Sequence, residues 1–126
     1  MEGSYWVELV GDVIVARIRG QPTPEIIKSC QDAVLLLLND TDRSKILYDA
    51  LEMLDPSVDI ALMQRSLDAS SLGDRPLRRA LVVPNSRIAF LSRLAFGDGT
   101  HRVFYNDLSG ALGWLNAAGD SGRGEG

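Results

Sequence analysis

The pattern of hydrophobic and polar positions divides the chain into strands and helices that alternate along most of its length. Residues 5–10 and 13–19 are rich in β-branched and aromatic side chains, which favour strands. Gly11 and Asp12 lie between these segments and have the conformational preferences of a tight turn. The N-terminal pattern therefore predicts a β-hairpin.

Four later segments place apolar residues three and four positions apart, the spacing of an α-helix with one buried face. Each segment follows a residue whose side chain can accept a hydrogen bond from the first helical turn. The N-caps that we expect are Thr23, Asp55, Asn85 or Ser86, and Asp107. Breaks in the helical pattern at 39–40, 70–73 and 97–99 mark the ends of the first three helices.

Three short apolar runs at 45–50, 79–83 and 101–105 separate these helices and predict strands. Strands that alternate with helices form a parallel sheet through right-handed crossovers. We therefore expect one α/β domain with a mostly parallel five-stranded sheet, an N-terminal hairpin and about four helices. The domain should span 1–119, and the glycine-rich, polar stretch 120–126 is expected to be a disordered tail.

Composition narrows the classes of function. The chain has 126 residues and a formal net charge of -4, and an acidic protein is a poor match for nucleic acid. The longest apolar run, residues 33–38, is far shorter than the roughly 20 residues of a membrane-spanning helix. With one cysteine, Cys30, and no secretory leader pattern, the protein is expected to be cytoplasmic and not inserted in a membrane.

Several segments resemble the SpoIIAA-like families of STAS domains (sulfate transporter and anti-sigma factor antagonist). The segments are KILYD at 45–49, RALVVPNS at 79–86, AFLSR at 89–93, RVFY at 102–105 and ALGWL at 111–115. The resemblance spans about residues 5–115 and implies a STAS-like fold, related in outline to lipid-carrying CRAL-TRIO domains. It also implies a non-catalytic binding or regulatory role without a cofactor.

In anti-sigma factor antagonists of this type, a serine at the start of the helix after the central strand is phosphorylated within an Asp-Ser-Ser-Gly-like motif. The matching stretch here is Asp55-Pro56-Ser57, so the resemblance makes Ser57 the candidate phospho-acceptor. The stretch departs from the motif, because Pro56 follows the acid and the second serine and the glycine are missing. The alternative role for Ser57 is to bond a backbone N–H of the first helical turn.

Acidic residues gather after the predicted central strand. Because open α/β sheets bind their ligands at the carboxyl ends of the strands, we expect a recognition edge that includes Asp49, Asp55 and Asp59. Asp49 and Asp55, together with Glu52, could also hold a cation. Loop solvation and helix capping are the simpler explanation, and no metal site is predicted.

Arginine is concentrated in the second half of the chain. Arg79, Arg87 and Arg93 are candidates for binding an anion, because a guanidinium group makes paired hydrogen bonds to carboxylates and phosphates. The alternative is that these side chains lie on separate solvated faces or cover apolar surface with their stems.

Three functional hypotheses follow. The first is a protein-binding regulatory module, acting on a partner protein or on itself as a homodimer, with Trp6 on an edge strand as a possible dimer contact. The second is a carrier of a small apolar or anionic amphipathic ligand, bound between a helix and the sheet. The third, an enzyme, rests only on the scattered Asp49, Ser57 and His101 and is not expected.

Overall fold

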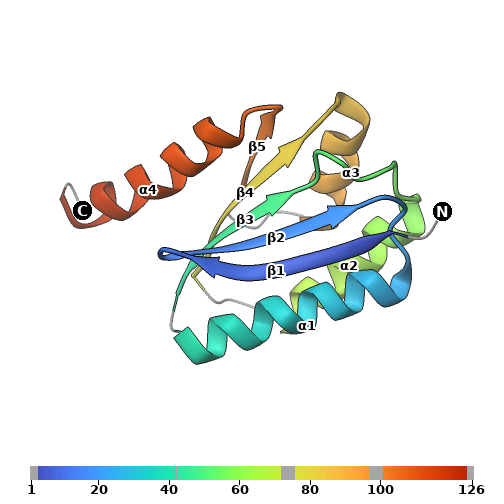
Figure 1. The fold of residues 1–126 in the computed structure, drawn as a ribbon, viewed down its shortest axis with the longest axis horizontal. Helices are drawn as coiled ribbons and strands as arrows, with labels where there is room; N and C mark the ends of the chain where they lie inside the picture. The colour runs from blue at the N-terminus through green and yellow to red at the C-terminus, as the bar shows by residue number, and fades with distance from the viewer. Residues whose placement is uncertain (1–2, 42, 72–75, 97–100, 125–126) are drawn as a thin grey trace.

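A computed structural model of the chain describes residues 3–41, 43–71, 76–96 and 101–124. The elements form a single sheet with helices on both of its faces (Figure 1). In chain order they are β1 (Ser4–Val10), β2 (Val13–Arg19), α1 (Pro24–Thr41), β3 (Lys45–Asp49), α2 (Val58–Ser71), β4 (Arg78–Val83), α3 (Ser86–Phe96), β5 (His101–Tyr105) and α4 (Leu108–Gly124).

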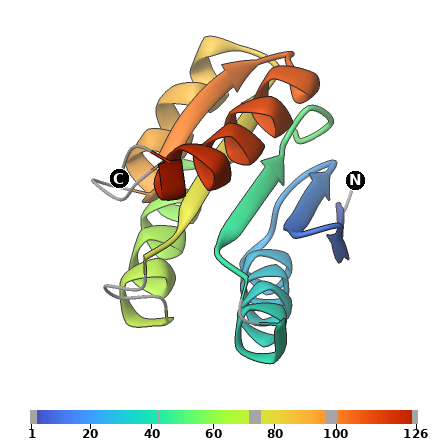
Figure 2. The same cartoon turned by 90° about the vertical axis from the view of Figure 1, so that its left-hand side faces the viewer.

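The strands lie side by side in the order β1-β2-β3-β4-β5. β1 pairs with β2 in antiparallel fashion, and the other three pairings are parallel. The expected α/β domain with a mostly parallel sheet and an N-terminal hairpin is therefore confirmed. Because each right-handed crossover returns the chain to the next strand along, α1, α2 and α3 lie on one face, and α4 lies alone on the other (Figure 2).

The hydrophobic core has a layer on each face of the sheet, because alternate side chains of a strand point in opposite directions. On one face α4 packs on Val15, Leu47 and Val82. On the other face α1 packs on Ile14 and Ile46. α2 makes its helix contacts with α1 and α3 in the part of the chain that the structure describes.

The side chains that cap three of the helices are those the sequence predicts. Thr23 Oγ1 accepts a hydrogen bond from Ile26 N at 3.2 Å. Asn85 and Asp107 accept equivalent bonds at the starts of α3 and α4, each at 2.9 Å. These bonds satisfy backbone donors that a helix leaves unpaired at its N-terminus.

The predicted cap of α2 is wrong by two residues. The helix starts at Val58, and Ser57 Oγ rather than Asp55 accepts the capping bond, from Ile60 N at 3.1 Å. The carboxylate of Asp55 pairs instead with Arg87 at 3.0 Å. Ser57 thus has the capping role that the sequence left as an alternative to phosphorylation.

The loop between β3 and α2 is held against the ends of neighbouring strands. Gly20 N donates to Glu52 O, and Leu54 N donates to Gly20 O, both at 2.9 Å. Ala50 N donates to Val82 O at 2.9 Å. Gly20 has a φ of 75°, a left-handed conformation that glycine adopts without strain. The loop therefore presents a defined surface at the carboxyl edge of the sheet.

Two boundary predictions are not tested by these elements. α4 continues to Gly124, and its side chains from residue 118 onward are outside the described residues, so the division into a domain at 1–119 and a tail at 120–126 stays a prediction. The predicted turn at 97–99 also falls outside the described residues.

Candidate functional site

The carboxyl edge of the sheet carries three acidic residues that are spaced three positions apart in the sequence, and each is paired with an arginine. The pairs are Arg17–Asp49 at 3.0 Å, Arg19–Glu52 at 2.9 Å and Arg87–Asp55 at 3.0 Å. The arginines come from β2 and α3, so these ion pairs join the loop after β3 to both sides of the edge. Paired in this way, the carboxylates have a structural explanation that needs no cation, and the described residues contain no cluster of three or more metal-ligating side chains.

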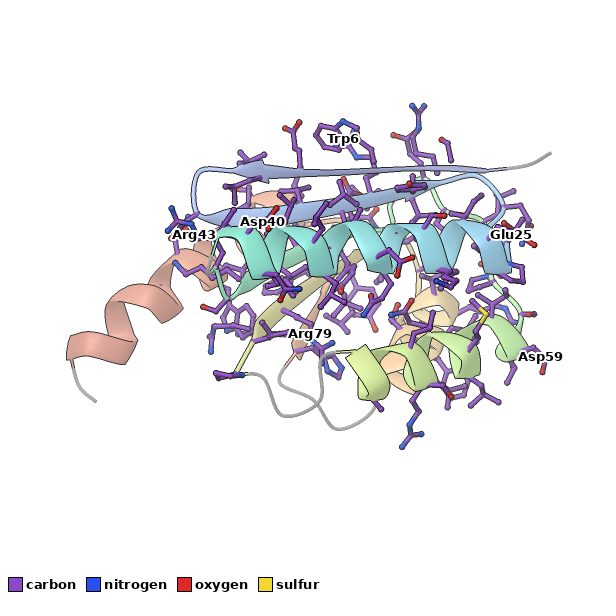
Figure 3. All side chains as sticks on the ribbon, turned by 90° about the horizontal axis from the view of Figure 1, so that it is seen from below. Trp6, Glu25, Asp40, Arg43, Asp59 and Arg79 are labelled. Carbon is purple, nitrogen blue, oxygen red and sulfur yellow. The ribbon has the colours of Figure 1, made fainter. Side chains whose placement is uncertain are left out.

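Asp49 is the buried member of this group, with 5% of its surface exposed. One carboxylate oxygen accepts from Arg17 Nε, and the other accepts from Leu51 N at 3.1 Å. Through these two bonds, Asp49 holds the start of the loop against β2. Asp55 and Asp59, the other two members of the predicted recognition edge, are exposed, and Asp59 lies at the start of α2 (Figure 3).

Four large apolar side chains are exposed on this loop and on the two helices α2 and α3. They are Leu54 (53% exposed), Val58 (46%), Leu62 (44%) and Phe90 (60%). We call these four residues the edge patch. Val58 and Leu62 are four positions apart on α2 and share a face of the helix. Scattered exposed apolar residues are common in proteins, but several in one place are typical of a binding surface.

The Asp55–Arg87 ion pair assembles the edge patch from two elements. It joins the residue after Leu54 to the first turn of α3, where Phe90 lies three positions beyond Arg87 on the same side of the helix. α2 also packs directly against α3. Leu54 and the start of α2 are thereby brought beside the exposed face of α3, with charged groups at the rim.

The three candidate anion-binding arginines do not come together. Arg79 is 5% exposed and lies on the side of β4 that faces α1, α2 and α3 (Figure 3). Arg87 is engaged with Asp55. Arg93 is exposed on α3. A shared anion site made by these residues therefore stays a prediction, and the arrangement of the described residues favours separate roles.

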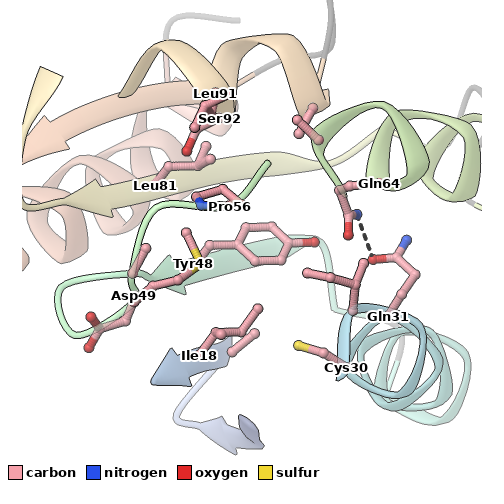
Figure 4. A pocket seen from close by; sticks show the side chains of 16 residues that line it. Ile18, Cys30, Gln31, Tyr48, Asp49, Pro56, Gln64, Leu81, Leu91 and Ser92 are labelled. Atoms are coloured by element: carbon pink, nitrogen blue, oxygen red, sulfur yellow. Dashed lines mark hydrogen bonds between the residues drawn. The ribbon is translucent and has the colours of Figure 1, made fainter. Parts of the chain in front are cut away.

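A pocket of about 80 Å³ lies between the sheet and the three helices α1, α2 and α3 (Figure 4). Its walls are mostly apolar and include Ile18, Met53, Leu81 and Leu91. At one end Gln64 Nε2 donates to Gln31 Oε1 at 3.2 Å, and Figure 4 shows the Tyr48 hydroxyl directed toward this pair. Arg79, Arg87 and Arg93 are not among the lining residues.

Cys30 also lines the pocket and is 3% exposed. Burial raises the pKa of its thiol from 9.0 to about 12, because the thiolate would lose its hydration. The thiol is therefore protonated at neutral pH and is a weak nucleophile.

The residues that would support an enzyme do not form a constellation. Asp49 and Ser57 lie at the carboxyl edge of the sheet, whereas His101 begins β5 at the opposite edge. Asp49 and Ser57 are themselves occupied by a buried ion pair and a helix cap. The nucleophile–base contact of covalent catalysis is not formed among these three residues.

Trp6 lies on the outer side of β1, an edge strand, and is 44% exposed (Figure 3). The guanidinium carbon of Arg17 lies 5.5 Å from the centre of its indole ring, a cation–π distance. This contact within the chain explains the position of the Trp6 side chain without a second copy of the protein. Self-association through this edge stays a prediction.

Sequence reasoning placed Asp49 and Asp55 at the carboxyl edge of the sheet, where the structure also has them, but missed the edge patch and the Gln31–Gln64 pair. Leu62 follows Val58 at helical spacing, but the sequence does not show which face of α2 is exposed. Two glutamines 33 positions apart give no sequence signal of contact. What could have drawn attention to Gln31 is its place among apolar residues on the buried face of the first helix.

Several solved structures are similar to this chain over nearly its whole length. An uncharacterised protein of the DUF3478 family with a SpoIIAA-like fold, from Shewanella loihica, has a TM-score of 0.64 and 21% identity, and the match covers 90% of this chain and 93% of that one. An anti-sigma factor antagonist from Mycobacterium paratuberculosis has a TM-score of 0.67 and 16% identity, with 91% and 95% covered. The anti-sigma factor antagonist SpoIIAA in its unphosphorylated form has a TM-score of 0.57 and 15% identity, with 92% and 99% covered.

No protein-family model and no curated protein matches the sequence. The structural matches establish the SpoIIAA-like fold that the sequence motifs predict. Among the described residues, each helix is too short or too polar to cross a lipid bilayer.

Proposed function

We propose that this chain, a domain with the SpoIIAA-like fold, is a non-catalytic regulatory module that binds a protein partner through the edge patch. The observation that carries the proposal is the exposure of Leu54, Val58, Leu62 and Phe90 on elements that the Asp55–Arg87 ion pair and the packing of α2 on α3 join. Apolar side chains ringed by charged groups match the apolar centre and polar rim of protein interfaces.

The similar solved structures support a regulatory role. Two of them are described as anti-sigma factor antagonists, which act on other proteins. Their fold is shared by this chain, and a fold alone does not determine function. The edge patch supplies the specific surface on which the proposal depends.

The rigid loop beneath the patch also supports binding. Its backbone is bonded to Gly20 and to Val82, and Asp49 holds its start. A preformed surface loses less conformational entropy when a partner binds. We therefore expect binding with little rearrangement of the loop.

Ser57 is the proposed site of control. It is exposed beside the edge patch, and its hydroxyl oxygen lies at the N-terminus of α2, where the helix dipole favours a phosphate. Phosphorylation there would add negative charge next to Asp55 and Asp59. A partner with an acidic or apolar contact surface would then bind less well.

The experiment is affinity capture from the cytoplasm of the source cell with two variants of matched chemistry. Leu62→Ser removes an apolar group from the edge patch, and Leu36→Ser removes another exposed leucine, from α1. A partner retained by the wild-type and Leu36→Ser proteins but lost with Leu62→Ser supports the proposal. Equal retention by all three proteins, or no retained partner, contradicts it.

A further inference from the structure

The pocket between the sheet and α1–α3 contains a buried polar group whose bonding is incomplete. Gln31 is 3% exposed, and its Nε2 has no hydrogen-bond partner in the part of the chain that the structure describes. The Oε1 of the same amide is occupied by Gln64. A buried donor without a partner is rare and costly in proteins, so the group calls for an acceptor.

The rest of the pocket is mostly apolar. Ala16, Ile18, Leu81 and Leu91 contribute walls from β2, β4 and α3. The charged residue in the lining, Asp49, already has both carboxylate oxygens bonded, to Arg17 and to Leu51 N. An anion in the pocket would therefore lose its hydration without gaining a cationic partner from the lining residues.

The pocket exists because the helices that border it have small side chains there. α2 packs against α1 and α3, and the pocket lies between these helices and the middle strands of the sheet (Figure 4). The small side chains Ala61, Ser92 and Ala95 face it from α2 and α3. Protein interiors are closely packed, and cavities larger than a water molecule are uncommon in them. Small residues on both helices at this position leave room that larger ones would fill.

From these features we infer that the pocket is a binding site for a small, uncharged molecule with an apolar body and one oxygen that accepts a hydrogen bond. The oxygen would accept from Gln31 Nε2, and the apolar body would contact Ile18 and Leu81. A volume of about 80 Å³ holds a body of a few heavy atoms, given that about 150 Å³ suffices for benzene. The inference is independent of the edge patch and of the proposed regulatory function.

The test uses 2-butanone as the probe and the folded full-length chain as the receptor. Amide chemical shifts are followed during titration, and saturable changes are expected around Gln31, Ala61 and Leu91 with a dissociation constant of the order of millimolar. Butyrate, an ion of similar size, should bind at least about tenfold more weakly because the pocket offers it no cation.

Two variants separate the contributions. Ala61→Met fills the pocket and should abolish saturable binding of 2-butanone. The double variant Gln31→Leu/Gln64→Leu keeps an apolar pocket but removes the amides, so it should bind 2-butanone about fivefold more weakly. Xenon, which enters apolar cavities, should bind the double variant as well as it binds the wild type.

Four outcomes would overturn the inference. The first is the absence of saturation by 2-butanone at about 100 mM, far above the expected range. The second is equal binding of butyrate. The third is undiminished binding to Ala61→Met or to the double variant, which would place the probe elsewhere. Detection of a long-lived water beside Gln31 that 2-butanone does not displace would also reject a ligand site.

Discussion

Arg17 and Asp49 are direct partners in the register of β2 and β3, and Arg17 Nε lies 3.0 Å from Asp49 Oδ2. The arginine side chain is 37% exposed, whereas that of the aspartate is 5% exposed. The carboxylate therefore depends on Arg17 and on the Leu51 backbone N–H for the hydrogen bonds that water would otherwise supply.

We predict that Arg17→Met destabilises the fold by about 2 kcal/mol, because it leaves the buried carboxylate of Asp49 short of a charged partner. The methionine retains much of the apolar stem of arginine, so packing changes little. The measurement is the free energy of unfolding from urea denaturation.

Arg19→Met is the matched control for this variant. The Arg19–Glu52 pair has nearly the same length, 2.9 Å, but both side chains are more than half exposed. Loss of a solvent-exposed pair should cost less than about 1 kcal/mol. Equal losses for the two variants would show that burial of Asp49 does not determine the effect.

The cap of α2 gives a second prediction. Ser57→Ala removes the acceptor for Ile60 N and should lower the free energy of unfolding by about 1 kcal/mol. Ser57→Asp supplies another capping oxygen and should be close to wild type in stability. Chemical denaturation of the three proteins measures both effects, and an unchanged stability in Ser57→Ala would argue against the cap.

The same two variants test whether Ser57 controls binding. A phosphate-like charge in Ser57→Asp should weaken the interaction with a partner captured through the edge patch, whereas Ser57→Ala should leave it intact. Titration calorimetry with that partner gives the two affinities. Identical affinities for Ser57→Asp and wild type would remove Ser57 as a switch, without affecting its role as a cap.

Two glycines in α4 should respond differently to substitution by alanine. A Cβ on Gly113 would meet open space, so Gly113→Ala should stabilise the protein by about 0.5–1 kcal/mol through the higher helix propensity of alanine. A Cβ on Gly110 would overlap the Asp107 carboxylate that caps the helix, so Gly110→Ala should give no gain. Thermal unfolding of both variants checks the contrast, and similar shifts in Tm would contradict it.

The raised pKa of Cys30 predicts how stability depends on pH. The folded protein holds the thiol proton more tightly than the unfolded chain, so this contribution is complete below pH 9 and is lost as pH rises toward about 12. Cys30→Ala lacks the contribution. The difference in unfolding free energy between wild type and Cys30→Ala should therefore shrink across this range, and a constant difference would refute the prediction.

Much of the fold is predictable because local patterns agree with tertiary packing. The apolar face of α1 contains Cys30 and Val34, both of which are buried in the structure as the helical spacing predicts. The start of α2 is the exception. Asp55 and Ser57 are both good caps by residue type, and the sequence does not reveal that Asp55 pairs with Arg87, which lies 32 positions further along the chain.

The candidate site is less predictable for the same reason. Residues at the carboxyl ends of strands share an edge, so Asp49 and Asp55 could be placed there from the sequence. The burial of Asp49 could not be predicted, because the sequence does not reveal that Arg17 on β2 is its partner. The exposure of Phe90, an aromatic residue that composition alone would assign to the core, depends on how α3 is rotated against the sheet.

The order of the strands also gives α4 a distinct position in the fold. Among the described elements, each of α1, α2 and α3 lies between two strands in chain order, whereas α4 has only β5 before it. It can consequently detach from the sheet without breaking a pairing among the five described strands, at the expense of its contacts with residues such as Leu47 and Val82. Amide hydrogens in α4 should thus exchange with solvent through a local opening. Those of the central strands should exchange only through global unfolding.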